Sequence, residues 1–199
     1  MVTSIRKYEF MRYTDIPEEF HSFESGGPFK KCKMCDKDLT SPDAHYVIEK
    51  AVRKYTGFKA WDVVFEYAIC MGCANSFRQQ LSTESIQNIE KYFLHNVDFT
   101  NHQNRLNAET QNISDFTSIC LVKGISKDKV EEYQIYGECR GNQFIYNAMP
   151  YMISGQAMDE IANLLSAKTL DELDGFSEKH LGPSPELEGL FKGKKLVLI

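Results

Sequence analysis

The sequence predicts an α+β fold in which a four-cysteine module precedes a small antiparallel sheet with C-terminal helices. Two Cys-x-x-Cys pairs enclose a stretch rich in Val, Ile, Tyr and Phe, which is typical of a β-hairpin. Further along the chain, apolar residues first alternate at strand spacing and then recur at helical spacing. These three patterns predict the fold class and the order of its parts.

The N-terminal part divides into an arm and a hairpin. Residues 1–28 show no clean periodicity and end in a Gly-Gly-Pro break, so we expect an irregular arm there. The two strands of the hairpin are expected at 44–52 and 61–69, with Thr56 and Gly57 in the turn between them.

Two helices are expected after the hairpin. The first begins near Cys73, because Phe77 and Leu81 are four residues apart and fall on one helix face. Ser82 is a typical N-cap for the second helix. The buried stripe of that second helix is expected to consist of Ile86, Ile89 and Phe93.

Residues 98–115 are polar, contain four asparagines and show no sustained apolar period. Such composition is typical of a loop rather than of a packed element. We therefore expect a linker or long loop in this segment.

The C-terminal part begins with a second expected hairpin. After a short apolar run at 119–122, an alternating strand precedes a turn at 140–142, and a second apolar run follows at 144–146. The residues expected to share one face of the first strand are Tyr133, Ile135, Gly137 and Cys139.

Helices and an apolar tail complete the expected order. Ser154 is expected to cap one helix, and Thr169 with Glu172 to form the capping box of another that stops before Pro183. A short last helix is expected through 184–190, and the apolar run 196–199 is expected to pair within the chain as an edge strand rather than to dock on a partner.

We therefore expect four segments: an N-terminal arm (1–28), a four-cysteine zinc-binding module (29–97), a linker or long loop (98–115) and a C-terminal α+β region (116–199).

Composition and charge restrict the function classes. With 42% hydrophobic and 12% aromatic residues the chain can form a packed core, and no stretch resembles a signal peptide or membrane span, so we expect a cytoplasmic protein. Residues 1–97 carry equal numbers of basic and acidic side chains, whereas 98–199 hold the whole net charge of −5. A broad basic face for duplex nucleic acid is therefore not evident, and the acidic region is the expected surface for a protein partner.

The four cysteines Cys32, Cys35, Cys70 and Cys73 are the candidate metal ligands. Each Cys-x-x-Cys turn directs two thiolates to one side, so two pairs supply the four ligands of a tetrahedral site. In a reducing compartment this pattern favours one Zn²⁺ per chain, with iron, disulfides and redox-active dithiols as alternatives. Because sulfur fills every coordination position, the metal is expected to be structural and not catalytic.

Residues 29–95 resemble a treble-clef or zinc-ribbon module, which consists of a knuckle, a hairpin and a Cys-x-x-Cys that leads into a helix. The common knuckle has glycine after its second cysteine, whereas this sequence has Asp36 there. The whole chain also resembles bacterial proteins that pair such a module with a C-terminal α+β region, and that resemblance implies no activity.

The HNH endonucleases share this zinc-supported shape, with an active histidine on the first strand of the hairpin. The local match is Asp43-Ala44-His45, but no histidine follows in the helix after Cys73. No catalytic residue is therefore assigned, and His45 is expected to be a strand-end residue.

Two function classes follow. The first is a zinc-stabilised binding or scaffold protein with a non-catalytic metal site. The alternative is a nucleic-acid-binding or HNH-like nucleic-acid-processing protein. Its expected phosphate contacts are Lys30, Lys31, Lys33, Lys37, Arg53 and Lys54. The remaining cysteines, Cys120 and Cys139, lie in apolar runs and are expected to be buried core residues rather than a redox pair.

Overall fold

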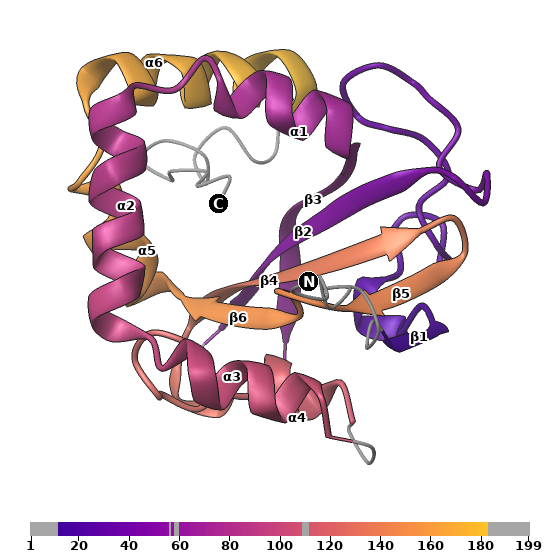
Figure 1. Cartoon of the computed structure of the whole chain (residues 1–199), viewed down its shortest axis with the longest axis horizontal. Coiled ribbons are helices and arrows are strands. Elements are labelled where there is room, and N and C mark those ends of the chain that lie inside the picture. Colours follow the sequence, from indigo (N-terminus) through magenta and orange to yellow (C-terminus); the bar gives the residue numbers. More distant parts are fainter. Residues whose placement is uncertain (1–11, 56, 58–59, 109–111, 183–199) are drawn as a thin grey trace, which may run out of the picture.

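The computed structural model describes residues 12–55, 57, 60–108 and 112–182 (Figure 1). Helices and strands mix in an α+β architecture, as the sequence predicts: the helices form a frame around the upper, left and lower parts of the view, and the strands lie inside and to the right of it. The strands are β1 (Arg12–Asp15), β2 (His45–Lys54), β3 (Trp61–Cys70), β4 (Glu132–Arg140), β5 (Gln143–Tyr146) and β6 (Tyr151–Ser154). The helices are α1 (Met71–Arg78), α2 (Thr83–Asn96), α3 (Phe99–Leu106), α4 (Ser114–Thr117), α5 (Gly155–Ala162) and α6 (Ala167–Phe176), with short turns η1 (Glu18–Phe20), η2 (Lys127–Lys129) and η3 (Ser177–Leu181). The last helix expected at 184–190 and the tail at 196–199 lie outside these residues.

The strands form one antiparallel sheet in the order β1-β5-β4-β2-β3. β5 pairs with the last residues of β4, and β6 pairs with its first residues along the same side. Both expected hairpins are present as β2–β3 and β4–β5. Because β2 is hydrogen bonded to β3 on one side and β4 on the other, the four-cysteine module and the C-terminal region contribute to the same sheet.

One face of the sheet packs against the N-terminal part of the described chain. Phe20 of η1 is fully buried, and its ring lies 4.8 Å from that of Phe144. Gly137 lies beneath both rings, and a Cβ atom added there would come within 2.7 Å of each. Glycine is therefore required at this position because the two aromatic rings occupy the space of a side chain.

The opposite face packs against helices. The ring of Tyr67 on β3 contacts that of Phe176 of α6 at 5.4 Å, and Phe77 of α1 lies 5.1 Å from the same ring. Near them Tyr136 of β4 contacts Met158 of α5. These contacts fix α1, α5 and α6 on the sheet by burial of aromatic surface.

The caps of α2 and α5 confirm the prediction. The side chain of Ser82 accepts a hydrogen bond from the backbone N–H of Ser85, and that of Ser154 accepts one from Ala157. Ile89 and Phe93 of α2 are buried and Ile86 is half-buried, as the stripe predicts. Local sequence signals are reliable here because each cap joins residues three positions apart.

The capping box predicted for Thr169 and Glu172 is wrong. α6 begins one turn earlier, and its N-cap is Ser166, whose side chain accepts from the backbone N–H of Thr169. Thr169 is instead fully buried, where its hydroxyl accepts a hydrogen bond from the backbone N–H of Ser82. A contact with another helix therefore determines the role of Thr169. Helical backbone ends at Leu181, before Gly182, close to the predicted stop.

The loop predicted at 98–115 is also wrong, because α3 lies within that range and α4 begins at its end. Asp98 caps α3 by accepting from the backbone N–H of Asn101. Within α3 only His102 and Leu106 are buried, so the helix has a narrow apolar stripe that gives a weak periodic signal. The division of the chain into separate domains at this point remains a prediction. No helix in the described part of the chain is both long and apolar enough to cross a membrane.

Candidate metal centre

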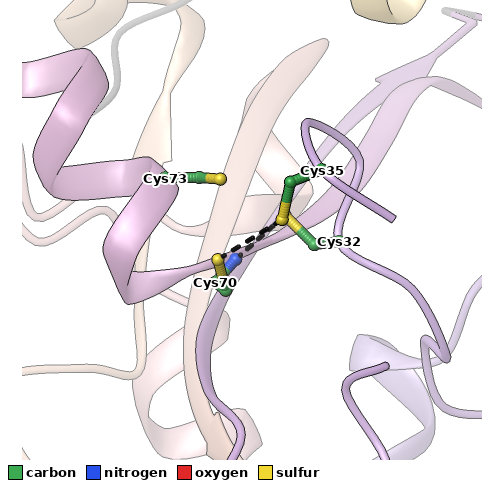
Figure 2. A group of neighbouring side chains, drawn as sticks. All are labelled: Cys32, Cys35, Cys70 and Cys73. Carbon is green, nitrogen blue, oxygen red and sulfur yellow. Dashed lines mark hydrogen bonds between the residues drawn. The ribbon is translucent and has the colours of Figure 1, made fainter. Parts of the chain in front are cut away.

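The four predicted cysteines come together from two places in the chain. Cys32 and Cys35 belong to a tight loop whose ends, Lys31 and Asp38, form an antiparallel bridge. Cys70 is the last residue of β3, and Cys73 lies in the first turn of α1. Figure 2 shows the four side chains directed toward one another. The sheet, the loop and a helix N-terminus thus each supply ligands.

The spacing of the sulfur atoms fits a tetrahedral metal site. All four Sγ atoms lie within 4.8 Å of one another, and the Sγ atoms of Cys35 and Cys70 are 3.9 Å apart. A zinc–sulfur bond of about 2.3 Å in tetrahedral geometry places its sulfurs about 3.8 Å apart. The cysteines are free thiols and not disulfides. The donor set therefore fits one metal ion that prefers four sulfur ligands.

Backbone hydrogen bonds shape the loop around these sulfurs. The N–H of Asp36 donates to the carbonyl of Cys32 at 2.9 Å, and the N–H of Cys32 donates to the carbonyl of Lys37 at 2.9 Å. Asp36 has a φ of 57°, the left-handed conformation that favours glycine. The sequence departs from the glycine of common knuckles, yet the backbone adopts the conformation for which that glycine is used.

Two further bonds join the loop to the sheet. The backbone N–H of Lys33 donates to the carbonyl of Ala68 on β3 at 2.9 Å. The backbone N–H of Cys70 donates to the Sγ of Cys32 at 3.3 Å, and this bond is drawn in Figure 2. A backbone donor directed at sulfur stabilises the thiolate form, which is the form that binds metal.

The thiols ionise unequally. Burial opposes ionisation of Cys32, but backbone hydrogen bonds from Cys70, Met34 and Cys35 outweigh it and lower its pKa to about 7. Burial and the neighbouring thiols raise the pKa of Cys73 far above its ordinary value. The pKa of Cys35 is also raised, because burial and the hydrogen bond with Cys32 outweigh the backbone bond from Lys37. One thiolate thus opposes the ionisation of the others, and a cation is required to hold four negative sulfurs together.

The ligands differ in exposure. Cys32 and Cys70 are buried, Cys73 is half-buried and Cys35 lies at the surface. Since cysteine provides all four ligands, no coordination position is left for water or substrate. The arrangement can therefore hold a metal in a structural role.

His45 has a partner that the sequence pattern does not reveal. Its Nε2 lies 2.6 Å from Oε1 of Glu138 on β4, and the side chain of Asn147 donates to the other oxygen of that carboxylate at 3.4 Å. His45 is at the expected strand end, at the start of β2. No spacing rule could have found Glu138, because the pairing of β2 with β4 creates the contact.

Six basic residues were expected to contact phosphate, and they fall into two groups. Lys30, Lys31, Lys33 and Lys37 are exposed on the loop that carries Cys32 and Cys35. Arg53 instead pairs with Glu132 at 2.6 Å, and the ammonium of Lys54 bonds the carbonyl of Lys127. Only the loop group is therefore exposed as a charged surface.

Cys120 and Cys139 are buried, as predicted, and both are free thiols. Burial raises the pKa of Cys139 to about 12, although a hydrogen bond with Tyr46 opposes the change. Cys120 lies beside β6, where its Sγ accepts from the backbone N–H and the hydroxyl of Ser154. The two cysteines therefore have different partners, Ser154 for Cys120 and Tyr46 for Cys139, and both are core residues.

Glu49 is a buried acid that no sequence motif marks. Its side chain is 2% exposed between β3 and β4, where Tyr67 and Tyr136 donate hydrogen bonds to its carboxyl oxygens. Burial raises its pKa to about 8, and the two tyrosine hydrogen bonds only partly oppose the shift. The available signal was the Glu49–Lys50 pair within an otherwise apolar strand.

Comparison with protein-family models, curated proteins and solved structures finds no match for this chain.

Proposed function

We propose that the protein is a binding or scaffold protein in which Cys32, Cys35, Cys70 and Cys73 hold one structural Zn²⁺. The observation that supports it is the convergence of four sulfurs within 4.8 Å at tetrahedral spacing. Iron binds the same donor set, and zinc is favoured because it needs no redox partner and is the usual metal of structural sites built from four cysteines.

The metal would hold a loop that buries few of its own side chains. Residues 31–38 contribute only Cys32 to the buried core, and the other side chains of the loop are exposed or half-buried. Structural zinc binding supplies a free energy on the order of 10 kcal/mol, far more than so small a loop gains by burial. The ion would therefore connect the loop, the end of β3 and α1.

Metal analysis of the purified full chain tests this proposal. We expect one zinc per chain, and we expect Co²⁺ substitution to give the intense visible bands of a tetrahedral thiolate complex. Cys73→Ser should abolish tight binding, because it removes one of the four ligands. Cys139→Ala is the matched control, since this buried cysteine does not belong to the cluster and its loss should leave the stoichiometry unchanged.

Hydrogen exchange tests the structural role separately. A chelator that removes the metal should speed amide exchange in residues 29–95, because those segments lose their common anchor. Unchanged protection in this range after complete metal removal would contradict a structural role. Two metal ions per chain would show a second site and would reopen the question of catalysis.

The proposal of a binding role rests on the closed metal centre and on the charge of the C-terminal half. A metal centre closed by four cysteines offers no chemistry to a substrate, and the net charge of −5 in residues 98–199 repels nucleic acid there. A protein partner is therefore the favoured ligand class. We place the protein in the cytoplasm, where reduced cysteines remain available to metal.

Nucleic-acid binding or HNH-like processing is the second candidate. The observations that favour it are the four exposed lysines of the cysteine loop and the carboxylate that orients His45. A labelled single-stranded or duplex probe at about 50 mM salt tests it, because phosphate contacts are strongest at low salt. Binding that is lost in a Lys30→Ala, Lys31→Ala, Lys33→Ala, Lys37→Ala variant would support this candidate, and absence of binding would exclude it.

A further inference from the structure

A cleft lies between residues 18–26, η2 and the sheet, away from the metal centre. Its volume is about 830 Å³, and β2, β3 and β4 each contribute side chains to its lining. Trp61, which lines the cleft, is the first residue of β3, whereas Cys70 of the metal centre is the last. The cleft is therefore a separate candidate site, and its size is typical of sites for small molecules.

Two exposed aromatic rings form one wall of the cleft. Phe23 is 66% exposed and Trp61 is 53% exposed, and their ring centroids lie 5.8 Å apart in an edge-to-face arrangement. Because the two rings are adjacent, they expose one continuous apolar surface rather than two isolated side chains. A flat ring of a ligand can pack against this surface.

A buried ion pair holds this wall in place. The ammonium of Lys50, which is 7% exposed, lies 3.1 Å from a carboxylate oxygen of Glu66 and also donates to the carbonyl of His21. The other carboxylate oxygen of Glu66 accepts a hydrogen bond from the backbone N–H of Phe23 at 2.7 Å. The loop that carries Phe23 is thus fixed to the sheet before a ligand binds, which lowers the entropic cost of binding.

Two ammonium groups line the same cleft. The Nζ atoms of Lys54 and Lys127 lie 5.8 Å and 5.7 Å from the ring centroid of Tyr133. Lys54 bonds the carbonyl of Lys127, and no carboxylate of a described residue forms an ion pair with either ammonium. Lys54 is also the cross-strand partner of Trp61, so the cationic and aromatic groups are adjacent. Two half-buried cations without a neutralising partner favour an anion.

Three carboxylates limit the charge that this anion can carry. Glu18, Glu19 and Asp128 line the cleft and are exposed. Burial raises the pKa of Tyr133, and the charges of Asp128 and Glu19 raise it further, so the carboxylates act on the same region as the ammonium groups. They would repel a ligand with several negative charges, such as a polyphosphate, and they favour a ligand with one.

We propose that this cleft binds a small aromatic anion, with the ring of the ligand against Phe23 and Trp61 and its single negative charge at Lys54 and Lys127. The opposite assignment, a cation held by the rings and the carboxylates, is less favourable because the ammonium groups are the more buried charges and are therefore less screened by water. The proposal requires neither the metal ion nor a protein partner.

Three matched probes test the proposal. Indole-3-acetate, indole-3-acetamide and tryptamine share one ring system and carry a negative charge, no charge and a positive charge. Because the chain has a single tryptophan, the indole N–H of Trp61 gives one resonance in the ¹H–¹⁵N spectrum of the labelled full chain. We expect indole-3-acetate to shift this resonance in a saturable way and to bind about fivefold or more tightly than the other two probes.

Two substitutions separate the effect of charge from that of the rings. Lys127→Met should weaken binding of indole-3-acetate about fivefold and leave that of indole-3-acetamide unchanged. Lys129→Met, in the same turn but outside the cleft, is the control and should change neither. Phe23→Ala should weaken both probes alike, because it removes part of the aromatic wall. Unchanged far-ultraviolet circular dichroism verifies the fold of each variant.

Four results would overturn the proposal. Preferred binding of tryptamine would show a site for cations, and equal binding of the three probes would show an apolar surface without selection for charge. The absence of a saturable shift at millimolar probe concentrations would show that the cleft is not a site for this class of ligand. Equal binding of indole-3-acetate to the parent chain and to Lys127→Met would show that the ammonium groups do not contact the anion.

Discussion

The hydroxyl groups of Ser82 and Ser166 lie 2.8 Å apart, and each residue is the N-cap of a different helix. The backbone N–H of Ser166 donates to the hydroxyl of Ser85 at 2.8 Å, and that of Ser82 donates to the hydroxyl of Thr169 at 3.0 Å. In a usual capping box the N3 side chain bonds the N-cap of its own helix. Here each N3 hydroxyl bonds the N-cap of the other helix, so α2 and α6 cap one another.

We predict that Ser85→Ala destabilises the protein by about 1–2 kcal/mol, because it leaves the partly buried N–H of Ser166 without its acceptor. Thr169→Val should destabilise by a similar amount, because it removes the acceptor of the Ser82 N–H. Urea unfolding followed by circular dichroism measures both. Ser76→Ala, on the exposed side of α1, is the control and should change stability little. If the two losses add without interaction in the double variant, the four hydroxyls do not act as one network.

Glu49 predicts a decrease of stability with rising pH. Its folded pKa of about 8 exceeds the ordinary value of 4.5, so the folded state binds the proton more tightly. The contribution of this group is fully present below pH 4.5 and is lost as the pH rises through 8. Between these values the slope is about −1.4 kcal/mol per pH unit.

Glu49→Gln should remove this slope, because the amide keeps the shape and hydrogen-bonding groups of the neutral acid. At pH 8 we expect the variant to be more stable than the parent chain by about 2 kcal/mol or more, given the size of the burial penalty. Denaturant titrations between pH 5.5 and pH 8.5 measure the difference. Parallel pH profiles for the two proteins would show that Glu49 is not protonated in the fold.

Asp36→Gly should stabilise the cysteine loop. A left-handed φ costs a non-glycine residue about 1 kcal/mol, so we expect a gain of up to about that size, with metal binding retained. Asp36→Ala keeps the steric cost of a Cβ atom at a left-handed φ and loses the polar side chain, so it should not raise the stability. Thermal unfolding of the metal-loaded chains measures this, and an equal effect of both variants would contradict the backbone argument.

Substitution by alanine should have opposite effects on stability at two of the glycines. Gly137→Ala should destabilise by about 2 kcal/mol or more, because the new methyl group would overlap the rings of Phe20 and Phe144. Gly175→Ala meets nothing within 4 Å on the exposed side of α6 and should stabilise by about 0.5–1 kcal/mol. Chemical denaturation of the two variants compares them, and a neutral Gly137→Ala would mean that Phe20 has room to move.

The sequence predicted the features that depend on nearby residues. The Cys-x-x-Cys turns, the β2–β3 hairpin and the caps at Ser82 and Ser154 each join residues that are close in sequence, so local patterns specify them. The convergence of the two cysteine pairs was predictable too, because the hairpin returns the chain to its starting end.

Features that depend on distant contacts were not predictable. α3 has only two buried residues, so its apolar periodicity in the sequence is weak. The burial of those two residues, His102 and Leu106, holds the helix in place. The N-cap of α6 is Ser166 and not the predicted Thr169, because the Thr169 hydroxyl bonds the N-cap of α2 instead. The pair of His45 and Glu138 depends on a strand register that sequence spacing does not contain.

The bond from Lys33 to Ala68 has a consequence for solubility. β3 is the last strand on its side of the described sheet, and this bond places the cysteine loop on its outer edge. Exposed strand edges pair readily with other chains, which leads to aggregation. If the metal were lost and the loop moved away, the carbonyl of Ala68 would be open to a strand from a neighbouring molecule. Scarcity of metal in the cell would then lower the amount of soluble protein before it affected the rest of the fold.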